Sequence, residues 1–551
     1  MKKLLLIAMF LTAVYGLSSA QTTYNLDVIW HCPKPDTFPW GMWGYSVAAG
    51  DFNNDGYIEI ISYDLNGNGP GRTKYKRYMY SSNPFDTIPE LVQEDSTGNN
   101  PSLCAGDWNG DGITDLAIVA FPIADYIGRI LICYGGAAFN LIATDTIYAP
   151  NIGIGYGENN AIRTGDINGD GIDDLIVGAY WGGGVFVYYG DTLGIHTTHD
   201  VRLRSKFSEN FGISVASGGD MNGDGYDEIA VGAPWNPESV GGGKIYIYNG
   251  GNPMDTLPAA WMFGENSGAQ LGGFRISIVP NGDSNYATGW WGTPFSPGGT
   301  GTDPGKQYWL FGGNPIDNDY DLSVMGYYYD SGLGFCSAYA GDVDGNKYGD
   351  YVCGDPYEHY RGGAYLWLGS ANLKNYCYGS ILGLDSNQIN GRAMNLGGNV
   401  FPIGDVDKCG SDEFAVANYF GDTLNAIWIC KYTGPSGVEQ IPDDRLQMTG
   451  IKLGQNYPNP FKQSTVISYQ ATGGGPVKLA VYNIAGQLVK TLINNPSPNA
   501  LGESRVGSVP KSGSVTWDGR DNNGKAVTNG VYIYRLEAGD YKATKKMVVI
   551  K

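Results

Sequence analysis

The chain has 551 residues, with 35 basic against 55 acidic side chains and a formal net charge of −20 at pH 7. Its 84 Gly and 28 Pro make about a fifth of the chain, below the roughly 25–30% of low-complexity chains, while 42% hydrophobic and 13% aromatic residues can build cores. This composition indicates a folded, turn-rich, all-β protein and excludes collagen, a coiled coil and an acidic disordered chain, and without basic clusters we expect no nucleic-acid partner.

Residues 1–20 have the features of a secretory signal peptide. Two lysines precede the apolar run Leu4 to Val14, and small residues lead to a cleavage site before Gln21. No segment reaches the roughly 18 apolar residues of a transmembrane helix, so we expect an exported protein without a transmembrane segment. Eight widely spaced cysteines allow some disulfides in an oxidising compartment but predict no disulfide framework.

A short acidic segment recurs at intervals of about sixty residues. It carries oxygen-bearing side chains at positions one, three and five, Gly at six and a carboxylate at nine. Regular copies begin at Asp51, Asp107, Asp166 and Asp220, and looser copies begin at Asp342 and Asp405. The longer gap between Asp220 and Asp342 spans two periods and holds a shortened remnant, Asn281 to Asn285. Seven repeats are therefore implied.

Short apolar strands surround each acidic segment, and a further strand follows a Gly-rich turn. Several strands per repeat favour radial repetition of four-stranded antiparallel sheets, so we predict a seven-bladed β-propeller over residues 21–434. The last repeat ends near Tyr432 one strand short, while Leu26 to Trp30 is an unclaimed strand. We predict that this N-terminal strand supplies the outer edge of the seventh blade and covers an exposed edge.

Three segments of the fourth repeat carry a resemblance to a known family. Phe211-Gly-Ile-Ser-Val, the Asp220 loop and Val231-Gly-Ala-Pro234 together resemble the FG-GAP repeat of integrin α-subunit propellers and their bacterial relatives. The resemblance extends from residue 22 to about residue 434. It implies a seven-bladed ring with calcium held in loops between the first two strands of a blade.

The acidic loops themselves point to a hard cation. Oxygen donors at positions one, three and five, a carbonyl at seven and a carboxylate at nine can surround one ion, and flexible oxygen ligands suit Ca²⁺ better than Mg²⁺. An EF-hand or dockerin is excluded because position twelve lies in an apolar strand. We expect about four to six structural Ca²⁺ sites with these candidate ligands: Asp51, Asn53, Asp55, Glu59, Asp107, Asn109, Asp111, Asp115, Asp166, Asn168, Asp170, Asp174, Asp220, Asn222, Asp224, Glu228, Asp342, Asp344, Asn346, Asp350, Asp405, Asp407 and Glu413.

Hairpin turns without metal are the alternative for these loops. This alternative has most weight in the two looser copies, because Lys347 stands where Gly is expected and Cys409 replaces an oxygen ligand. The occupancy of the Asp342 and Asp405 loops is therefore left open.

Residues 435–450 are predicted to be a linker, and residues 451–551 are predicted to form a small Ig-like β-sandwich. Tyr457-Pro-Asn-Pro-Phe461, Tyr482-Asn-Ile-Ala-Gly486 and the terminal Lys546-Met-Val-Val-Ile-Lys551 resemble, in this order, the type A C-terminal sorting domain of type IX secretion. The segment from Trp517 to Gly524 is also similar to the Ig-like domain of flagellar hook-capping proteins. The resemblance implies passage through the outer membrane of a Bacteroidetes-type bacterium, followed by release or surface attachment.

The sequence contains no recognised catalytic motif, such as His-Glu-x-x-His, Gly-x-Ser-x-Gly or a dinucleotide fingerprint. His196 and His199 lie in a Thr-rich connection and are expected to be solvated loop residues. Gly519 to Lys525 resembles a phosphate-binding loop. Ala526 stands where such a loop has a metal-binding Ser or Thr hydroxyl, and no helix follows, so we predict a hairpin turn. We predict that the chain is not an enzyme, although acidic pairs for sugar chemistry stay open.

An aromatic residue lies at the end of the second strand of every repeat, opposite the calcium loops. These rings either wedge between neighbouring blades or form a platform for sugars or a protein at one mouth of the propeller. The candidate ligand-binding residues are Tyr63, Phe121, Trp181, Trp235, Trp290, Trp291, Tyr357 and Tyr419.

These observations predict a secreted or cell-surface, calcium-binding propeller of the adhesion type. We expect it to bind an extracellular protein or polysaccharide and to engage the type IX secretion machinery through its C-terminal domain. An extracellular carbohydrate-active or phosphodiester-cleaving enzyme is the main alternative, and a structural protein of the envelope is the second.

Overall fold

The computed structural model is described here in ranges of residues that cover most of the chain. The expected signal peptide, the repeat remnant Asn281 to Asn285 and most of the expected linker lie outside them. The described residues are 22–24, 26–33, 43–65, 75–83, 87–95, 102–120, 128–150, 155–157, 161–181, 184–205, 209–239, 242–264, 270–273, 275–279, 288–293, 305–313, 315–316, 318, 322–326, 332–356, 362–369, 379–382, 396–418, 426–434, 446–447, 452–453, 456, 458–471, 477–484, 486–495, 511–538 and 541–550.

The chain divides into two compact units, one built on most of Met1–Asp443 and the other on Asp444–Lys551. Among the described residues, every regular element is a strand except the short 3-10 turn η2 (Pro237–Ser239). The expected all-β class is confirmed.

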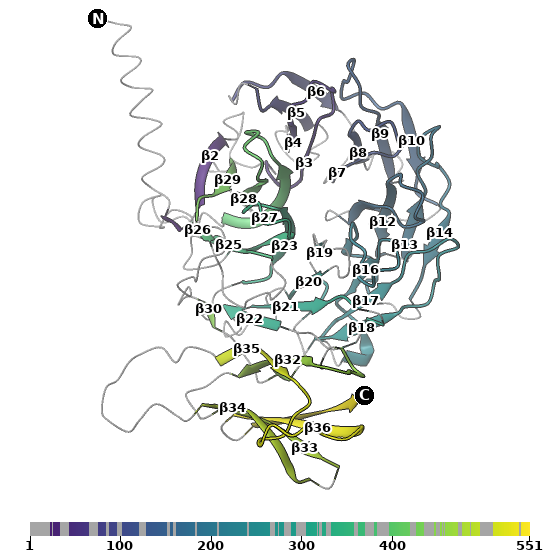
Figure 1. Ribbon diagram of the computed structural model, residues 1–551. Helices are drawn as coiled ribbons and strands as arrows, with labels where there is room; N and C mark the ends of the chain where they lie inside the picture. Colours follow the sequence, from purple (N-terminus) through teal and green to yellow (C-terminus); the bar gives the residue numbers. More distant parts are fainter. Residues whose placement is uncertain are drawn as a thin grey trace, which may run out of the picture. The chain divides into compact units, whose positions relative to one another are not determined.

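Seven antiparallel sheets are described in the larger unit, and in each of them successive strands of the chain lie side by side (Figure 1). The first three sheets are β3 (Val47–Gly50), β4 (Glu59–Leu65), β5 (Tyr75–Ser81) and β6 (Leu91–Asp95); β7 (Leu103–Gly106), β8 (Asp115–Ala120), β9 (Arg129–Cys133) and β10 (Asp145–Tyr148); and β11 (Ile162–Gly165), β12 (Asp174–Ala179), β13 (Gly184–Tyr188) and β14 (Val201–Leu203).

The remaining four sheets repeat this order. They are β15 (Val215–Ala216), β16 (Ile229–Ala233), β17 (Lys244–Tyr248) and β18 (Ala260–Phe263); β19 (Ile276–Val279), β20 (Thr288–Thr293), β21 (Lys306–Phe311) and β22 (Leu322–Gly326); β23 (Cys336–Gly341), β24 (Asp350–Asp355), β25 (Gly363–Trp367) and β26 (Gly379–Leu382); and β27 (Leu396–Gly404), β28 (Glu413–Asn418) and β29 (Ala426–Tyr432), completed by β2 (Leu26–Pro33).

The sheets follow one another around a common centre. The first strands of consecutive sheets contact each other in the order β3, β7, β11, β15, β19, β23 and β27, and β27 contacts β3 again. Second strands such as β8 and β12 are buried along their whole length, because both of their faces pack against neighbouring sheets. Their continuous apolar runs fit this burial on two sides. The larger unit is therefore a β-propeller.

The two ends of the propeller chain meet in its last sheet. Strand β2 pairs antiparallel with β29, with Leu26 opposite Tyr432, and the predicted role of this N-terminal strand as the outer edge is confirmed. A bulge between Val28 and Trp30 interrupts the register. The strand β1 (Thr22–Tyr24) pairs with β26 of the preceding sheet, which the sequence reading missed.

The smaller unit contains two antiparallel sheets, and the short strand β30 (Leu446–Gln447) belongs to the sheet of β19 to β22. One sheet is β31 (Lys452–Leu453), β32 (Thr465–Ala471) and β35 (Lys511–Trp517); the other is β34 (Leu488–Asn495), β33 (Val477–Asn483), β36 (Gly530–Ala538) and β37 (Tyr541–Val549). Both sheets contribute to one core, which includes Ile467, Leu479, Trp517 and Leu536. This is a β-sandwich. Asp521 N–H donates to Lys525 O at 2.8 Å, so the segment that imitates a phosphate loop is a tight turn.

The seven cysteines among the described residues are all free thiols, and six of them are buried. Burial raises the pKa of the Cys104 thiol to about 12, which keeps it protonated and unreactive. Hydrophobic burial between sheets stabilises the described fold without disulfides.

Candidate cation loops and ligand surface

Six acidic loops connect the first and second strands of their sheets and share one hydrogen-bond frame. In the Asp220 loop, Asp220 Oδ1 accepts the N–H of Asp224 at 3.1 Å and Oδ2 accepts the N–H of Gly225 at 2.8 Å. The equivalent pair of bonds forms in each of the other five loops. The first carboxylate of each loop therefore folds the loop around itself, in the manner of an Asx turn.

Two positions of the frame need a left-handed backbone. Position six has positive φ in every loop, and Gly occupies it except at Lys347, which has φ 72°. Position four also has positive φ, with Asn54 at 59° and Lys408 at 57° where the other loops have Gly. A residue with a Cβ is disfavoured in this region, so Lys347 costs some stability. The sequence reading recognised the requirement at position six and missed the one at position four.

The ninth residue of each loop lies beneath the loop. These carboxylates have no exposed surface, and each accepts the N–H of position two; they are Glu59, Asp115, Asp174, Glu228, Asp350 and Glu413. Burial, with a smaller contribution from the nearby Asp224 and Asp220, raises the pKa of Glu228 to about 8. Burial likewise raises the pKa of Asp115 to about 7. A cation in the loop favours the ionised form of such a group.

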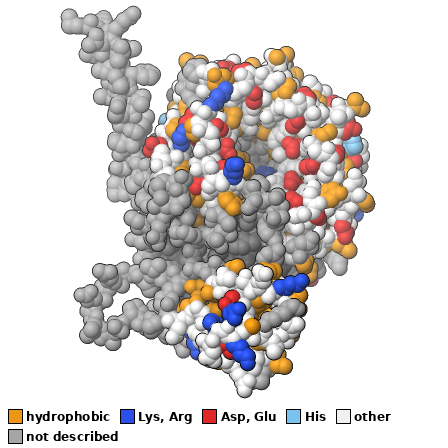
Figure 2. All heavy atoms as spheres, viewed as in Figure 1, with side chains coloured by type: hydrophobic (Ala, Val, Ile, Leu, Met, Phe, Trp, Pro, Cys, Tyr) orange, Lys and Arg blue, Asp and Glu red, His pale blue; other side chains and the backbone are white. Residues whose placement is uncertain are grey.

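Ligand atoms of acidic groups converge in three of the loops. They lie within 4.8 Å of one another at Asp220, Asp224 and Glu228; at Asp342, Asp344 and Asp350; and at Asp405, Asp407, Cys409 and Glu413. On the face shown in Figure 2, Asp and Glu side chains gather around the central hollow of the larger unit.

In the loops that begin at Asp51, Asp107 and Asp166, the described acidic groups do not converge this closely. The expected cation sites at these three loops stay predictions. In the first two of these loops the Asn at position three donates to the carboxylate at position five, with Asn53 Nδ2 to Asp55 Oδ2 and Asn109 Nδ2 to Asp111 Oδ2 both at 3.1 Å. The amide thus takes up a carboxylate oxygen that a cation would otherwise contact.

Asn222 gives the Asp220 loop a donor set that fits a hard cation. Its side chain is only 7% exposed, and its Nδ2 donates to Glu228 Oε1 at 2.8 Å. Its Oδ1 is buried without a hydrogen-bond partner among the described residues. A buried carbonyl oxygen without a partner is costly, and beside three carboxylates it is a fitting ligand for Ca²⁺.

The eighth residue of three loops joins neighbouring sheets, and the sequence reading did not single it out. Asp227 Oδ2 accepts the N–H of Asp166 at 3.0 Å, and the N–H of Asp227 donates to Asp166 O, also at 3.0 Å. The same two bonds link Asp173 to Asp107 and Asp412 to Asp342. Burial raises the pKa of Asp227 to about 6. The adjacent acidic residues at positions eight and nine of these three loops were the feature of the sequence that could have indicated this contact.

The aromatic candidates for ligand binding fall into different environments. Trp181 is 69% and Trp235 is 55% exposed, at the ends of the second strands β12 and β16. Tyr63 is fully buried in a core between the first two sheets, so its assignment to a ligand platform is wrong. Phe121, Tyr357 and Tyr419 lie outside the described residues, as do the side chains of Trp290 and Trp291.

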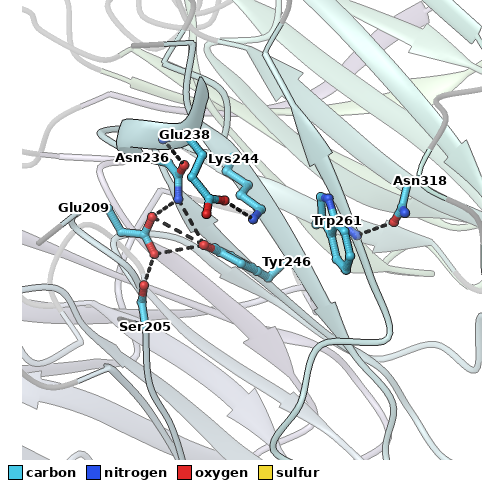
Figure 3. Close-up of polar contacts among 8 residues, drawn as sticks. All are labelled: Ser205, Glu209, Asn236, Glu238, Lys244, Tyr246, Trp261 and Asn318. Atoms are coloured by element: carbon cyan, nitrogen blue, oxygen red, sulfur yellow. Dashed lines mark hydrogen bonds and ion pairs between the residues drawn. The ribbon is translucent and has the colours of Figure 1, made fainter. Parts of the chain in front are cut away.

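A buried polar network fixes the backbone next to Trp235 (Figure 3). The N–H of Trp235 donates to Glu209 O at 3.2 Å. The buried Glu209 carboxylate accepts from Ser205 Oγ, from Asn236 Nδ2 and from the Tyr246 hydroxyl, the last at 3.1 Å. Several donors therefore stabilise this carboxylate, which we interpret as structural.

Further aromatic side chains are exposed on the same sheet. The Lys244 ammonium lies 4.4 Å from the ring centre of Tyr246, 5.2 Å from that of Trp261 and 4.8 Å from that of Phe263, and it pairs with Glu238 at 3.1 Å. Trp261 is 38% and Phe263 is 40% exposed. The N–H of Trp261 donates to Asn318 Oδ1 at 2.8 Å (Figure 3). The sequence reading missed both rings, because they lie on the outer strand.

His196 lies between two carboxylates rather than next to a nucleophile. Its Nδ1 is 3.0 Å from Asp200 Oδ1 and its Nε2 is 3.7 Å from Asp191 Oδ2. These residues line an open depression that also includes His199. The two histidines are loop residues, as expected.

Comparison with known proteins identifies the repeat. A family model described as the FG-GAP repeat matches residues 159–192 and 211–248, which contain the Asp166 and Asp220 loops. The chain is 34% identical to integrin alpha-7 of Rattus norvegicus over 265 residues, which is 43% of this chain and 22% of the relative. It is 38% identical to integrin alpha-6 of Gallus gallus over 121 residues, 20% of this chain and 11% of the relative. The chain thus spans about a fifth or less of these relatives.

Solved structures with some likeness have low TM-scores. The Dos1 propeller has a TM-score of 0.37 at 10% identity and covers 75% of this chain and 97% of its own. PorZ, a surface component of the type-IX secretion system of Porphyromonas gingivalis, has a TM-score of 0.22 at 11% identity, covering 92% of this chain and 75% of its own. The fold assignment therefore rests on the sheets and on the FG-GAP repeats. Within the described part of the chain, no helix is long and apolar enough to cross a membrane.

Proposed function

We propose that the chain is a calcium-binding, seven-bladed FG-GAP propeller that acts outside the cell as an adhesion-type module for a protein or polysaccharide. The observation that carries this proposal is the recurrence of one acidic loop frame in a propeller whose FG-GAP repeats resemble those of integrin α chains. Each of the seven sheets is interpreted as one blade.

Calcium would neutralise the carboxylates that each loop brings together. The Asp220 loop has the most suitable donors, in Asp220, Asn222, Asp224 and Glu228. The Asp342 loop offers three converging carboxylates, and the loops of the first three sheets share the same frame. The ion would act structurally, by removing the repulsion between like charges and favouring the folded state.

A melting curve of the full chain with CaCl₂ and with a chelator tests this part of the proposal. At a calcium concentration about 100 times the dissociation constant, one site contributes about 2.7 kcal/mol to the free energy of unfolding. We expect a clearly higher midpoint with calcium. An equal midpoint in both conditions would refute calcium binding at these loops.

The exposed rings of Trp181 and Trp235 are the proposed recognition surface. Both follow second strands at the end opposite the acidic loops, where they are free to stack on sugars or pack against a protein. Binding of the full chain to arrays of glycans and extracellular proteins should weaken in Trp181→Ala and Trp235→Ala. Leu257→Ala is the matched control, since Leu257 is 71% exposed but is not part of this surface. Release of products from a polysaccharide would instead favour the enzyme alternative.

We also propose export through a signal peptide and the type IX pathway, with the smaller unit as an Ig-like sorting domain. This follows from the resemblance of the segments around Phe461, Tyr482 and Lys546. In a bacterium with type IX secretion, removal of residues 451–551 should leave the protein inside the outer membrane, while the full chain reaches the medium or the surface. Equal export of both chains would contradict this role.

A further inference from the structure

The Asp405 loop has an unusual partner for its buried ninth carboxylate. In two other loops with Glu at position nine, an Asn at position three donates to it: Asn53 Nδ2 to Glu59 Oε1 at 3.2 Å and Asn222 Nδ2 to Glu228 Oε1 at 2.8 Å. Position three of the Asp405 loop is Asp407, whose carboxylate has no N–H to donate. Glu413 Oε1 accordingly has no hydrogen-bond partner among the described residues, although Glu413 is fully buried.

Lys431 supplies a positive charge at this place. Its ammonium forms a short ion pair with Asp407 Oδ2 and lies 3.8 Å from Glu413 Oε1. Strand register explains its position, because Phe414 on β28 pairs with Cys430 on β29 and the next pair outward is Glu413 with Lys431. By the same register, the residues opposite position nine in the other loops are Ser81, Tyr134, Tyr189, Asn249 and Leu368, none of which is cationic.

The remaining ligand set of this loop suits calcium poorly. Position five is Cys409, whose thiol is exposed and is a soft donor, whereas Ca²⁺ prefers oxygen. A divalent ion at the loop centre would also lie close to the Lys431 ammonium and be repelled by it. The loop keeps the shared frame nonetheless, with Asp405 accepting the N–H groups of Cys409 and Gly410.

We propose that the Lys431 ammonium closes the Asp405 loop in place of a divalent ion. Lys431 lies on β29, which pairs with the N-terminal strand β2, and Asp27 is its register partner there. In the sheet that joins the two ends of the propeller chain, the Lys431 side chain thus offsets one of the negative charges of the loop and keeps the loop folded without metal. This inference rests on the proposed function in assuming that other loops hold calcium.

Calcium stoichiometry of the full chain tests the proposal, measured with CaCl₂ by native mass spectrometry and calorimetry. Asp407→Asn should leave the number of bound ions unchanged, because the Asp405 loop holds none. The double variant Cys409→Asp with Lys431→Met restores an oxygen ligand and removes the ammonium, so it should bind one more ion than the parent. Lys408→Met is the control, since the Lys408 ammonium lies over the Tyr57 ring at 3.3 Å and should not change the count.

Loss of one calcium ion in Asp407→Asn would overturn the proposal, and so would the absence of a gain in a folded double variant. Stoichiometric Zn²⁺ binding that disappears in Cys409→Ser would overturn it as well, by showing a thiolate metal site. If the double variant does not fold, Asp407→Asn alone decides. Failure of the proposed calcium function gives a different result. In that case the parent chain binds no calcium, which refutes calcium at the other loops. If the double variant then binds one ion, the Lys431 inference is still supported.

Discussion

Glu228 illustrates how a single buried carboxylate is placed in these loops. It accepts N–H groups from Met221 and Asn222, yet burial and the neighbouring carboxylates raise its pKa to about 8. Without a cation such a group holds a proton at neutral pH, and cation binding must displace that proton. The buried carbonyl of Asn222 is the neutral oxygen that completes this donor set.

Removing that carbonyl gives the first prediction. Asn222→Ala should weaken calcium binding of the Asp220 loop by about tenfold, or about 1.4 kcal/mol, because one oxygen ligand is lost. Asn222→Asp keeps an oxygen at this place and should retain binding. Calorimetric titration of both variants with CaCl₂ is the measurement, and equal affinity in Asn222→Ala and the parent would show that Asn222 is not a ligand.

His196 gives a prediction about pH. The hydrogen bond to Asp200 raises the pKa of His196, with a smaller effect of Asp191, whereas burial and the nearby Arg202 lower the pKa of His199. Because the folded-state pKa of His196 exceeds the unfolded value, its pairing stabilises the fold below about pH 6.5 and is lost as the pH rises through the raised value. His196→Gln should therefore destabilise the protein more at pH 6 than at pH 8.

Thermal melting of both chains at the two pH values measures this difference. The effect should be small, since the side chain is half-exposed and solvent screens the ion pairs. A larger loss of stability at pH 8 than at pH 6 would contradict the assignment.

At the scale of elements, the acidic loops do more than join two strands of one sheet. Asp173, Asp227 and Asp412 bind the backbone of the preceding acidic loop through both their N–H and their carboxylate. Thr114 occupies this position in the second loop, where its side chain packs against Gly50 of the first sheet. Each loop is thus held in place by its neighbour as well as by its own hydrogen bonds.

Asp227→Ala should destabilise the protein by about 1–3 kcal/mol, because the N–H of Asp166 loses its acceptor in a partly buried place. Asp255→Ala is the control, since Asp255 is exposed and, within the described part of the chain, accepts only the N–H of Leu257 two residues on. Urea unfolding of both variants in calcium is the measurement. Equal midpoints for the two variants would exclude a link between sheets at Asp227.

At the scale of the whole molecule, ring closure depends on packing between the last and first sheets. Trp30 on β2 is 6% exposed, and its ring lies 5.7 Å from that of Tyr80 on β5 of the first sheet. The same core contains Trp43, Phe401 and Ile427. The N-terminal strand therefore joins the two ends of the ring through side chains as well as through backbone hydrogen bonds.

Trp30→Ala should cost about 3–5 kcal/mol of unfolding free energy, as expected for truncating a buried aromatic side chain. Trp235→Ala should cost far less, because Trp235 is 55% exposed. Chemical denaturation compares the two variants. If both lose the same small amount, Trp30 does not support ring closure.

Local patterns in the sequence already determined much of this protein. The positions of the acidic loops, the strands on either side of them, the all-β class and the pairing of Leu26 to Trp30 with the last sheet could all be predicted, because turn chemistry and apolar runs act over a few residues. The Gly at position six was predictable for the same reason.

Tertiary structure decided which side chains are exposed, which loop carboxylates lie close together and which residues link neighbouring strands or sheets. Tyr63 and Trp235 were both predicted to line one mouth of the propeller, yet Tyr63 lies within β4 and is buried between sheets, whereas Trp235 lies two residues beyond β16 and is 55% exposed. The contacts of Asp227 with Asp166 and of Lys431 with Asp407 depend on sheet neighbours and strand register, which no local pattern contains. Burial and convergence are set by residues far apart in the chain, so they became visible only when the sheets were packed around their common centre.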